Sequence, residues 1–414
     1  MALCIIAGYA KASFVEAIQT VAHANGHTVG VAFERRAETD SKQAYLAQFT
    51  ETFDLTTEAD VEKLRAASVA AVTVIQERDM DTYVRILEIT DEITPQQHEK
   101  YTALTNKRTF KQSLQAIHPQ LVPKVFSVTD NSLEEVATEI SYPAILKPTG
   151  LSGSAYVQMV HSPSELKEAF SNSKAAIAER SQNTYNRDSE IIVEEYVRGT
   201  HYSVNAYIDA SGKLTYCPLV RVVPAFELNI NDGYSVYQYV TSELNSVGTE
   251  ALFAAVKTIA THFEIKKTST HFDMVLTQSG WKCLEVGLRI GGNRHQMFEK
   301  SHGFSHYQND MKNRLGETIV IPDVKGTVCV MQKAATTTGI LNHISYTRIA
   351  NEPDTPMIEE MKLTSRQGEE VKPVAIGGGT LTRHLIYGKL GSDSYTEAKR
   401  LFDAIDINVT PSQS

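Results

Sequence analysis

Two acidic side chains inside short apolar segments are the first candidates for chemistry in this sequence. The segments HFDMVL and KCLEV alternate as strands do, and a strand places successive side chains on opposite faces. Asp273 then lies opposite the apolar face of the first strand. In the second strand Leu284 and Val286 share one face, which leaves Glu285 on the other. A hairpin centred on Ser279, with QSG as its turn, predicts that the two acids are direct cross-strand neighbours.

Carboxylates held this close repel each other, and a divalent cation would remove the repulsion. Asp and Glu oxygens with no nearby thiolate favour magnesium or manganese over zinc, and magnesium commonly bridges a carboxylate and nucleotide phosphates. The alternative is a solvated hairpin face, or acids that pair with arginines such as Arg289. The hairpin alone does not decide between these two interpretations.

A segment rich in glycine and serine is the second candidate. TGLSGSA, residues 149–155, follows a strand with Lys147 near its end, and glycines let backbone N–H groups wrap closely around a phosphate that this lysine could reach. It is not a P-loop, because GxxxxGK[ST] occurs nowhere. The plain alternatives are a hairpin turn for the loop and, for Lys107 on a helix predicted at 105–117, a solvated charge.

Three further features carry weaker signals. EIIVEEYV and YSVNAYI alternate like strands that pair with each other around Arg198-Gly199, and the acids that end the first segment permit a nucleotide-binding hinge. His271 could orient a substrate, and Arg383-His384 could reach an active site. Packing histidines and plain strands are commoner, so we leave these three residues out of the catalytic set.

The elements that must position these groups begin with an N-terminal βαβ unit. The opening ALCIIAGYAKASFVEAIQTVAHANGHTVGVAFE reads as strand, turn, amphipathic helix, Asn-Gly stop and strand, a pattern that builds parallel sheets. Its turn GYAKAS is not GxGxxG, so we interpret Gly8 as a turn glycine. The missing fingerprint weighs against a dinucleotide-dependent oxidoreductase. EITPQQHEK predicts a boundary near residue 95.

Composition bounds the protein's class. A length of 414 residues suggests two or three domains, and a formal net charge of −9 argues against nucleic-acid binding through a broad basic surface. No apolar run reaches the roughly 20 residues that span a bilayer, and MALCIIAG lacks the features of a signal peptide. We expect a cytoplasmic protein with no membrane partner, and a homodimer by default. The cysteines, which are expected to be reduced packing residues, are Cys4, Cys217, Cys283 and Cys329.

Taken in chain order, these motifs resemble the ATP-grasp superfamily from about Thr105 to Gly292. The series is a helix lysine, a strand lysine before a glycine-rich loop, EE-Y-V-x-G before a strand, and H-x-D followed by LE-x-x-x-R-x-x-G. Within the superfamily the last pair is most similar to carboxylate-amine ligases of the L-amino-acid ligase type. The resemblance implies an α/β protein with an α+β ATP-grasp part. Its expected domains are a Rossmann-like βαβ domain at 1–95, an ATP-grasp domain at 96–320 with a lid at about 141–208, and a small α+β domain at 321–414.

The resemblance also implies roles for the candidate residues. Lysines would contact ATP phosphates, the loop would close over them, the hinge would hold adenine, the paired acids would bind magnesium or manganese, and an arginine would stabilise an acyl phosphate. The implied catalytic residues are Arg289 and Lys147. The implied ATP-binding residues are Lys107, Lys147, Gly150, Ser152, Gly153, Ser154, Glu194, Glu195, Val197 and His201, and the implied metal ligands are Asp273 and Glu285.

The expected activity is ATP-dependent joining of a carboxylate to an amine through an acyl phosphate, with amino acids as the expected small-molecule substrates. Two positions depart from the superfamily pattern: His201 stands where an acid often binds ribose, and Gly287 stands where asparagine is often a third metal ligand. The alternatives are an ATP-grasp carboxylase, a purine-pathway type of ligase, or a nucleotide-binding protein without ligase activity.

Overall fold

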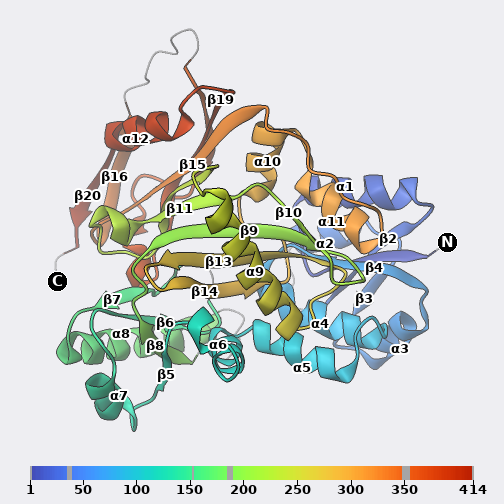
Figure 1. The fold of residues 1–414 in the computed structure, drawn as a ribbon, viewed down its shortest axis with the longest axis horizontal. Coiled ribbons are helices and arrows are strands. Elements are labelled where there is room, and N and C mark those ends of the chain that lie inside the picture. Colours follow the sequence, from blue (N-terminus) through green and yellow to red (C-terminus); the bar gives the residue numbers. More distant parts are fainter. Residues whose placement is uncertain (1, 35–39, 152, 184–189, 347–354, 413–414) are drawn as a thin grey trace.

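The computed structural model describes residues 2–34, 40–151, 153–183, 190–346 and 355–412. The described chain forms four β-sheets with helices packed around them, which confirms the predicted mixture of α/β and α+β structure. Figure 1 shows the largest sheet running through the middle of the molecule, with the N-terminal part in blue towards one end and the C-terminal strands in orange and red towards the other.

The N-terminal sheet is parallel, in the order β3-β2-β1-β4. The predicted βαβ unit is confirmed, and its helix ends where Asn25 caps it and Gly26 takes a φ of +73°. Gly8 is the predicted turn residue: its φ is +73°, and a Cβ there would lie 2.2 Å from Cγ of Asp79. The elements are β1 (Leu3–Ala7), α1 (Ala12–Ala24), β2 (Thr28–Phe33), α2 (Asp40–Leu46), β3 (Thr52–Asp54), α3 (Glu58–Ala66), β4 (Val69–Val74) and α4 (Met80–Ile89).

A smaller antiparallel sheet follows, in the order β5-β8-β6-β7. The strands on either side of the glycine-rich loop pair as a hairpin, with Ala144 opposite Val160. The loop is thereby anchored at both ends. The elements are α5 (Pro95–Leu104), α6 (Lys107–Gln115), β5 (Val125–Val128), α7 (Leu133–Glu139), β6 (Ala144–Pro148), β7 (Gln158–Val160), α8 (Pro163–Asn183) and β8 (Ile191–Glu195).

The large sheet has nine strands, in the order β14-β13-β9-β11-β12-β15-β19-β17, with β10 beside β9. It is continuous across residue 320, because β12 pairs with β15. The domain limits at 95, 141–208 and 320 stay predictions. The elements of this central part of the chain are β9 (Thr200–Ile208), β10 (Leu214–Tyr216), β11 (Val220–Pro224), β12 (Ser235–Val240), α9 (Ser246–His262), β13 (Thr268–Thr277), β14 (Gly280–Gly287), α10 (Arg294–His302) and α11 (His306–Arg314).

The C-terminal part adds strands to the large sheet and forms a three-stranded sheet in the order β18-β16-β20. Its elements are β15 (Gly326–Ala334), β16 (Gly339–Tyr346), β17 (Met357–Leu363), β18 (Glu370–Val371), β19 (Thr380–Lys389), α12 (Ser394–Ala404) and β20 (Ile405–Pro411).

The expected pairing of EIIVEEYV with YSVNAYI is wrong. β8 pairs with β5 and β6 in the small sheet, whereas β9 pairs with β11 and β13 in the large one. Arg198-Gly199 is therefore a crossing between two sheets and not a hairpin turn. A Cβ on Gly199 would lie 2.2 Å from the carbonyl oxygen of Leu276, so the crossing chain packs directly on the end of β13. Strand alternation in the sequence shows two strands but not which sheet each joins.

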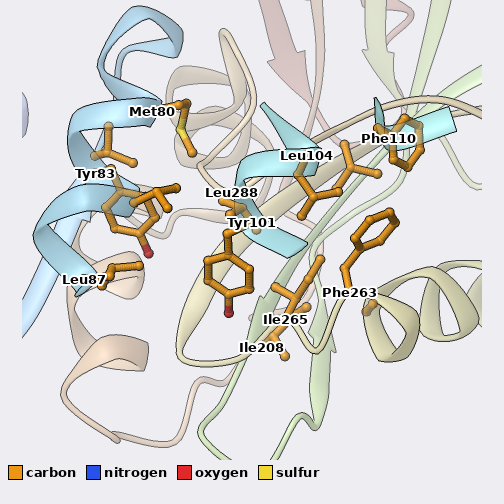
Figure 2. Close-up of a cluster of buried hydrophobic side chains, with 14 of the residues drawn as sticks. Met80, Tyr83, Leu87, Tyr101, Leu104, Phe110, Ile208, Phe263, Ile265 and Leu288 are labelled. Carbon is orange, nitrogen blue, oxygen red and sulfur yellow. The ribbon is translucent and has the colours of Figure 1, made fainter. Parts of the chain in front are cut away.

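The main hydrophobic core connects the N-terminal helices to the large sheet. Figure 2 shows Tyr83 and Leu87 of α4 beside Tyr101, and Phe110 of α6 near Phe263, in one cluster of buried side chains. The rings of Phe110 and Phe263 have centroids 5.7 Å apart. Because this core buries one face of α6, it fixes the direction in which the lysines of that helix point.

The cysteines are free and buried, as predicted for packing residues. Burial raises the pKa of Cys4 to about 11, so its thiol is a poor nucleophile at neutral pH. Among the described residues, every helix is too short or too polar to cross a lipid bilayer.

A buried polar network joins the N-terminal sheet to α11. Arg314 donates to both carboxylate oxygens of Asp310 at 3.1 Å and to the hydroxyl of Tyr83 at 2.7 Å. Thr73 of β4 donates to the same carboxylate. Both charged side chains are almost fully buried, so each depends on the other for its neutralisation.

We expect Asp310→Ala to lower the free energy of unfolding by about 3–5 kcal/mol, because it leaves the Arg314 guanidinium buried without a carboxylate. The double variant Asp310→Ala/Arg314→Met should recover much of that loss, since no unpaired charge remains. Urea unfolding of the three proteins measures both effects. Equal stabilities of the single and double variants would contradict this account.

Candidate active site

The predicted site residues meet around a cavity of about 370 Å³ between the small sheet, β9 and the β13–β14 hairpin. Gly150 lines a small adjoining cavity, and Ser152 lies outside the described residues. The predicted residues that line the main cavity are Lys107, Lys147, Gly153, Ser154, Glu194, Glu195, Val197, His201, Asp273, Glu285 and Arg289.

The two acids of the hairpin face each other as predicted, but the turn and the strand register differ from the prediction. Asp273 and Glu285 are direct cross-strand partners. The predicted turn centred on Ser279 is wrong, because Thr277 pairs with Gly280 and the turn has two residues. A β-bulge after Asp273 restores the register by inserting one extra residue in β14. The predicted grouping of Leu284 with Val286 is wrong for the same reason: a bulge turns one side chain out of alternation, and Leu284 lines the cavity beside Glu285.

The two paired acids differ in their electrostatic surroundings. Burial would raise the pKa of Glu285, but Lys107, whose Nζ lies 3.5 Å from that carboxylate, leaves the pKa lower than usual. The pKa of Asp273 is raised by burial, and the negative charge of Glu285 adds to this. The alternative in which Arg289 pairs with these acids is wrong, since Arg289 binds Glu77 at 2.8 Å.

This donor set fits a divalent cation, because two half-buried carboxylates face each other and Asp273 forms no ion pair within the described residues. Within the described ranges no group of three or more His, Cys, Asp or Glu side chains is arranged around a metal position. The remaining ligands of a bound ion would therefore have to be water or substrate oxygens.

Gly287 is explained by its neighbour across the hairpin. A Cβ at this position would lie 2.1 Å from Cε1 of His271, so the imidazole occupies the space that a side chain at 287 would need. The Nδ1 of His271 lies 3.0 Å from the carbonyl oxygen of Arg289, which fixes the ring against the strand that follows the hairpin. A side chain such as asparagine at position 287 would therefore overlap the imidazole of His271 in its present position.

A further lysine near the cavity, Lys111, was not predicted from the sequence, and it neutralises the buried carboxylate of Glu194. Lys111 is fully buried, and its Nζ lies 2.6 Å from Glu194, which also pairs with Lys147. Burial alone would raise the pKa of Glu194, but the two lysines lower it. Burial lowers the pKa of Lys111 to about 8. The available signal was the spacing of four residues from Lys107, which places both lysines on one face of α6.

Two other residues were also missed: Glu77 lines the small adjoining cavity, and Arg294 lines the main one. Glu77 follows the carboxyl end of β4, where parallel strands commonly place functional groups, and it holds Arg289. Arg294 is buried, and its Nη1 donates to Oε1 of Gln238 at 2.7 Å. Burial lowers the pKa of Arg294 to about 10. Neither residue belongs to a motif that the sequence alone makes visible.

Part of the chain matches a model of a known protein family. The ATP-grasp domain family matches residues 140–296. These residues form an ATP-grasp domain. The resemblance inferred from the motif series is confirmed, and the match contains the glycine-rich loop, the hinge and the β13–β14 hairpin.

Known proteins show where the likeness lies. A D-alanine–D-alanine ligase of Pediococcus pentosaceus is 30% identical over 98 residues, which span 24% of this chain and 22% of that ligase. An L-amino acid ligase of Bacillus licheniformis has the same fold over 99% of this chain and 98% of that one, with a TM-score of 0.71 and 17% identity. The biotin carboxylase domain of Hydrogenobacter thermophilus 2-oxoglutarate carboxylase, solved with MgADP and bicarbonate, has a TM-score of 0.62 and 13% identity, covering 98% and 90%.

The His271–Gly287 contact gives a stability test. We expect Gly287→Ala to lower the free energy of unfolding by about 1–3 kcal/mol, because the methyl group overlaps the imidazole. In a His271→Ala background the same substitution should cost far less, since the space is then open. Thermal unfolding of the four proteins in this cycle gives the coupling. Additive effects would contradict the contact.

The low pKa of His201 gives a pH test. Burial lowers the pKa of His201 to about 4, and the Arg221 guanidinium adds to this. An unfolded histidine titrates near about 6.5, so the unfolded state binds more protons between these values and the free energy of unfolding falls as pH drops through this window. We expect His201→Gln to lose less stability than the parent between pH 7 and pH 4.5 in urea titrations. Parallel losses would show that His201 does not contribute.

Proposed function

We propose that this protein is an ATP-dependent ligase that activates a carboxylate as an acyl phosphate and joins it to an amine, with ADP and phosphate as the other products. The observation that carries the proposal is the opposition of Asp273 and Glu285 across the hairpin, in one cavity with Lys107 and Lys147. Such a cavity gathers positive charge around a polyanion and presents two carboxylates for its metal ion.

The first step joins two anions, because the substrate carboxylate attacks the γ-phosphorus of ATP and ADP leaves. The lysines and Arg289 would lower the repulsion between the two groups. Asp273 and Glu285 would hold magnesium, with manganese as a possible substitute, and the ion would supply further charge neutralisation at the phosphates. An amine then attacks the acyl carbon, phosphate leaves and an amide forms. This reaction requires no nucleophilic side chain.

The other candidate residues have supporting roles in this proposal. Gly150 to Ser154 close over the phosphates and exclude water, which would otherwise hydrolyse the acyl phosphate. Glu194 to Val197 present backbone groups to adenine where the chain leaves the small sheet. His201 is neutral at pH 7, and its imidazole would hydrogen-bond a ribose hydroxyl where an acid is common in the superfamily.

Amino acids are the proposed substrates, so the product would be a dipeptide or an amino-acid amide. Support comes from the whole-chain fold likeness to an L-amino acid ligase. The alternative is a carboxylase, since a biotin carboxylase domain shares the fold over nearly the same length. We propose a cytoplasmic homodimer that acts on small molecules, a state that light scattering of the purified protein would test.

The test incubates the protein with ATP, magnesium and pooled amino acids and follows ADP, phosphate and new amide masses. We expect all three products, and we expect Glu285→Ala to reduce turnover by at least about 100-fold through loss of charge stabilisation at the phosphates. Glu134→Ala is the matched control, because Glu134 is an exposed acid on α7 that pairs only with Lys167 in the described structure.

Each outcome separates the candidates. Turnover triggered by bicarbonate but not by amino acids would support the carboxylase alternative. ATP binding without turnover, after the pool is widened to other acids and amines, would support a nucleotide-binding protein without ligase activity. An unchanged rate in Glu285→Ala would remove the proposed metal site.

A further inference from the structure

Arg383 of β19 is the strongest unassigned group near the active site. It lines two cavities, of about 690 and 510 Å³, that adjoin the main cavity through shared lining residues Gly292 and Asn293. It is absent from the lining of the main cavity, where the lysines and the paired acids lie. A residue from the C-terminal part of the chain therefore lines cavities next to the candidate active site.

The guanidinium of Arg383 is oriented but not neutralised. Its Nε donates to Oε1 of Gln332 at 3.1 Å, and its Nη1 donates to Oδ1 of Asn293 at 3.2 Å. Both partners are uncharged amides, and no carboxylate in the described ranges forms an ion pair with it. Burial lowers the pKa of Arg383.

Three other partly or fully buried arginines pair with acids, whereas Arg294, like Arg383, is held by an amide oxygen and forms no ion pair within the described residues. Arg289 pairs with Glu77, Arg314 pairs with Asp310, and Arg221 pairs with Glu227. A half-buried guanidinium held by two amide oxygens keeps its full charge and has donors left to give. Such a group is well suited to bind a carboxylate, because planar guanidinium and carboxylate groups match in geometry.

The cavity that Arg383 shares with Arg289 is rich in positive charge. Four of its lining side chains carry cationic groups and one carries an acid, Glu77, which Arg289 already engages. Arg78 lies 4.0 Å from Asp79, so Lys11 and Arg383 are the lining cations that form no ion pair within the described residues. The cationic lining residues are Lys11, Arg78, Arg289 and Arg383. This imbalance favours an anionic ligand group.

The position of Arg383 decides which anion it receives. The carboxylate that is phosphorylated must meet ATP in the main cavity, beside Lys107 and Lys147, so a group bound by Arg383 belongs to the other substrate. We propose that Arg383 binds a carboxylate of the amine-donating substrate and thereby selects free amino acids over amines that lack a carboxylate. This inference rests on the proposed ligase function.

The kinetic test compares each of the twenty common amino acids with its α-amide as amine donor. In Arg383→Met we expect KM for the free amino acid to rise roughly 10- to 100-fold, the usual range for a lost hydrogen bond to a charged group, with kcat changed far less. The preference for free acid over amide should approach one, KM for ATP should not change, and Arg383→Lys should recover part of the affinity.

Arg400→Met is the matched control, because Arg400 pairs with Glu397 on α12. An unchanged KM and preference in Arg383→Met, or equal use of acid and amide by the parent, would overturn the inference while leaving the ligase function intact.

A binding measurement decides the inference even if no amide is ever detected. The thermal midpoint of the protein with MgADP is measured with each free amino acid and with its amide. Stabilisation by one or more free amino acids but not by their amides, lost in Arg383→Met and kept in Arg400→Met, supports the site. Stabilisation that is equal in both variants, or absent in the parent, overturns it.

Discussion

The opposition of two carboxylates across one hairpin is the constraint on which the rest of the site depends. Asp273 and Glu285 face each other because a bulge shifts the register of β14 between them and the turn. Burial raises the pKa of Asp273, the negative charge of Glu285 adds to this, and Lys107 lies 3.5 Å from Glu285. Lys107 lowers the cost of holding these two acids together, because its positive charge lies beside Glu285.

The lysines near the cavity, Lys107, Lys111 and Lys147, come from α6 and β6, and hydrophobic packing brings these elements together. The core between α4, α5 and α9, part of which Figure 2 shows, orients α6. Lys107 thereby reaches the hairpin, while Lys111 lies buried against Glu194. Glu194 in turn holds Lys147 at the end of β6. One carboxylate therefore sets the positions of two lysines, which a surface pair would not do, because solvent screens exposed charges.

The large sheet lets distant segments contribute to one site. It runs from the hairpin through β9 and β12 into the C-terminal strands, as Figure 1 shows, so that Arg383 lies near the glycines after Arg289 although almost a hundred residues separate them. The crossing at Gly199 connects this sheet to the small sheet that bears the glycine-rich loop. The cavity lies where these layers meet.

The sequence by itself determined the local elements and the order of the motifs. Alternation and helical spacing found the βαβ unit, the helices and the facing of Asp273 with Glu285, because these depend on neighbours within a few residues. The tertiary structure alone decided the rest: the bulge that exposes Leu284 to the cavity, the separation of β8 from β9, and the partners of Arg289, Lys111 and Arg383. Each of these depends on contacts between segments far apart in the chain, and the spacing of residues along a single sequence carries no record of such contacts.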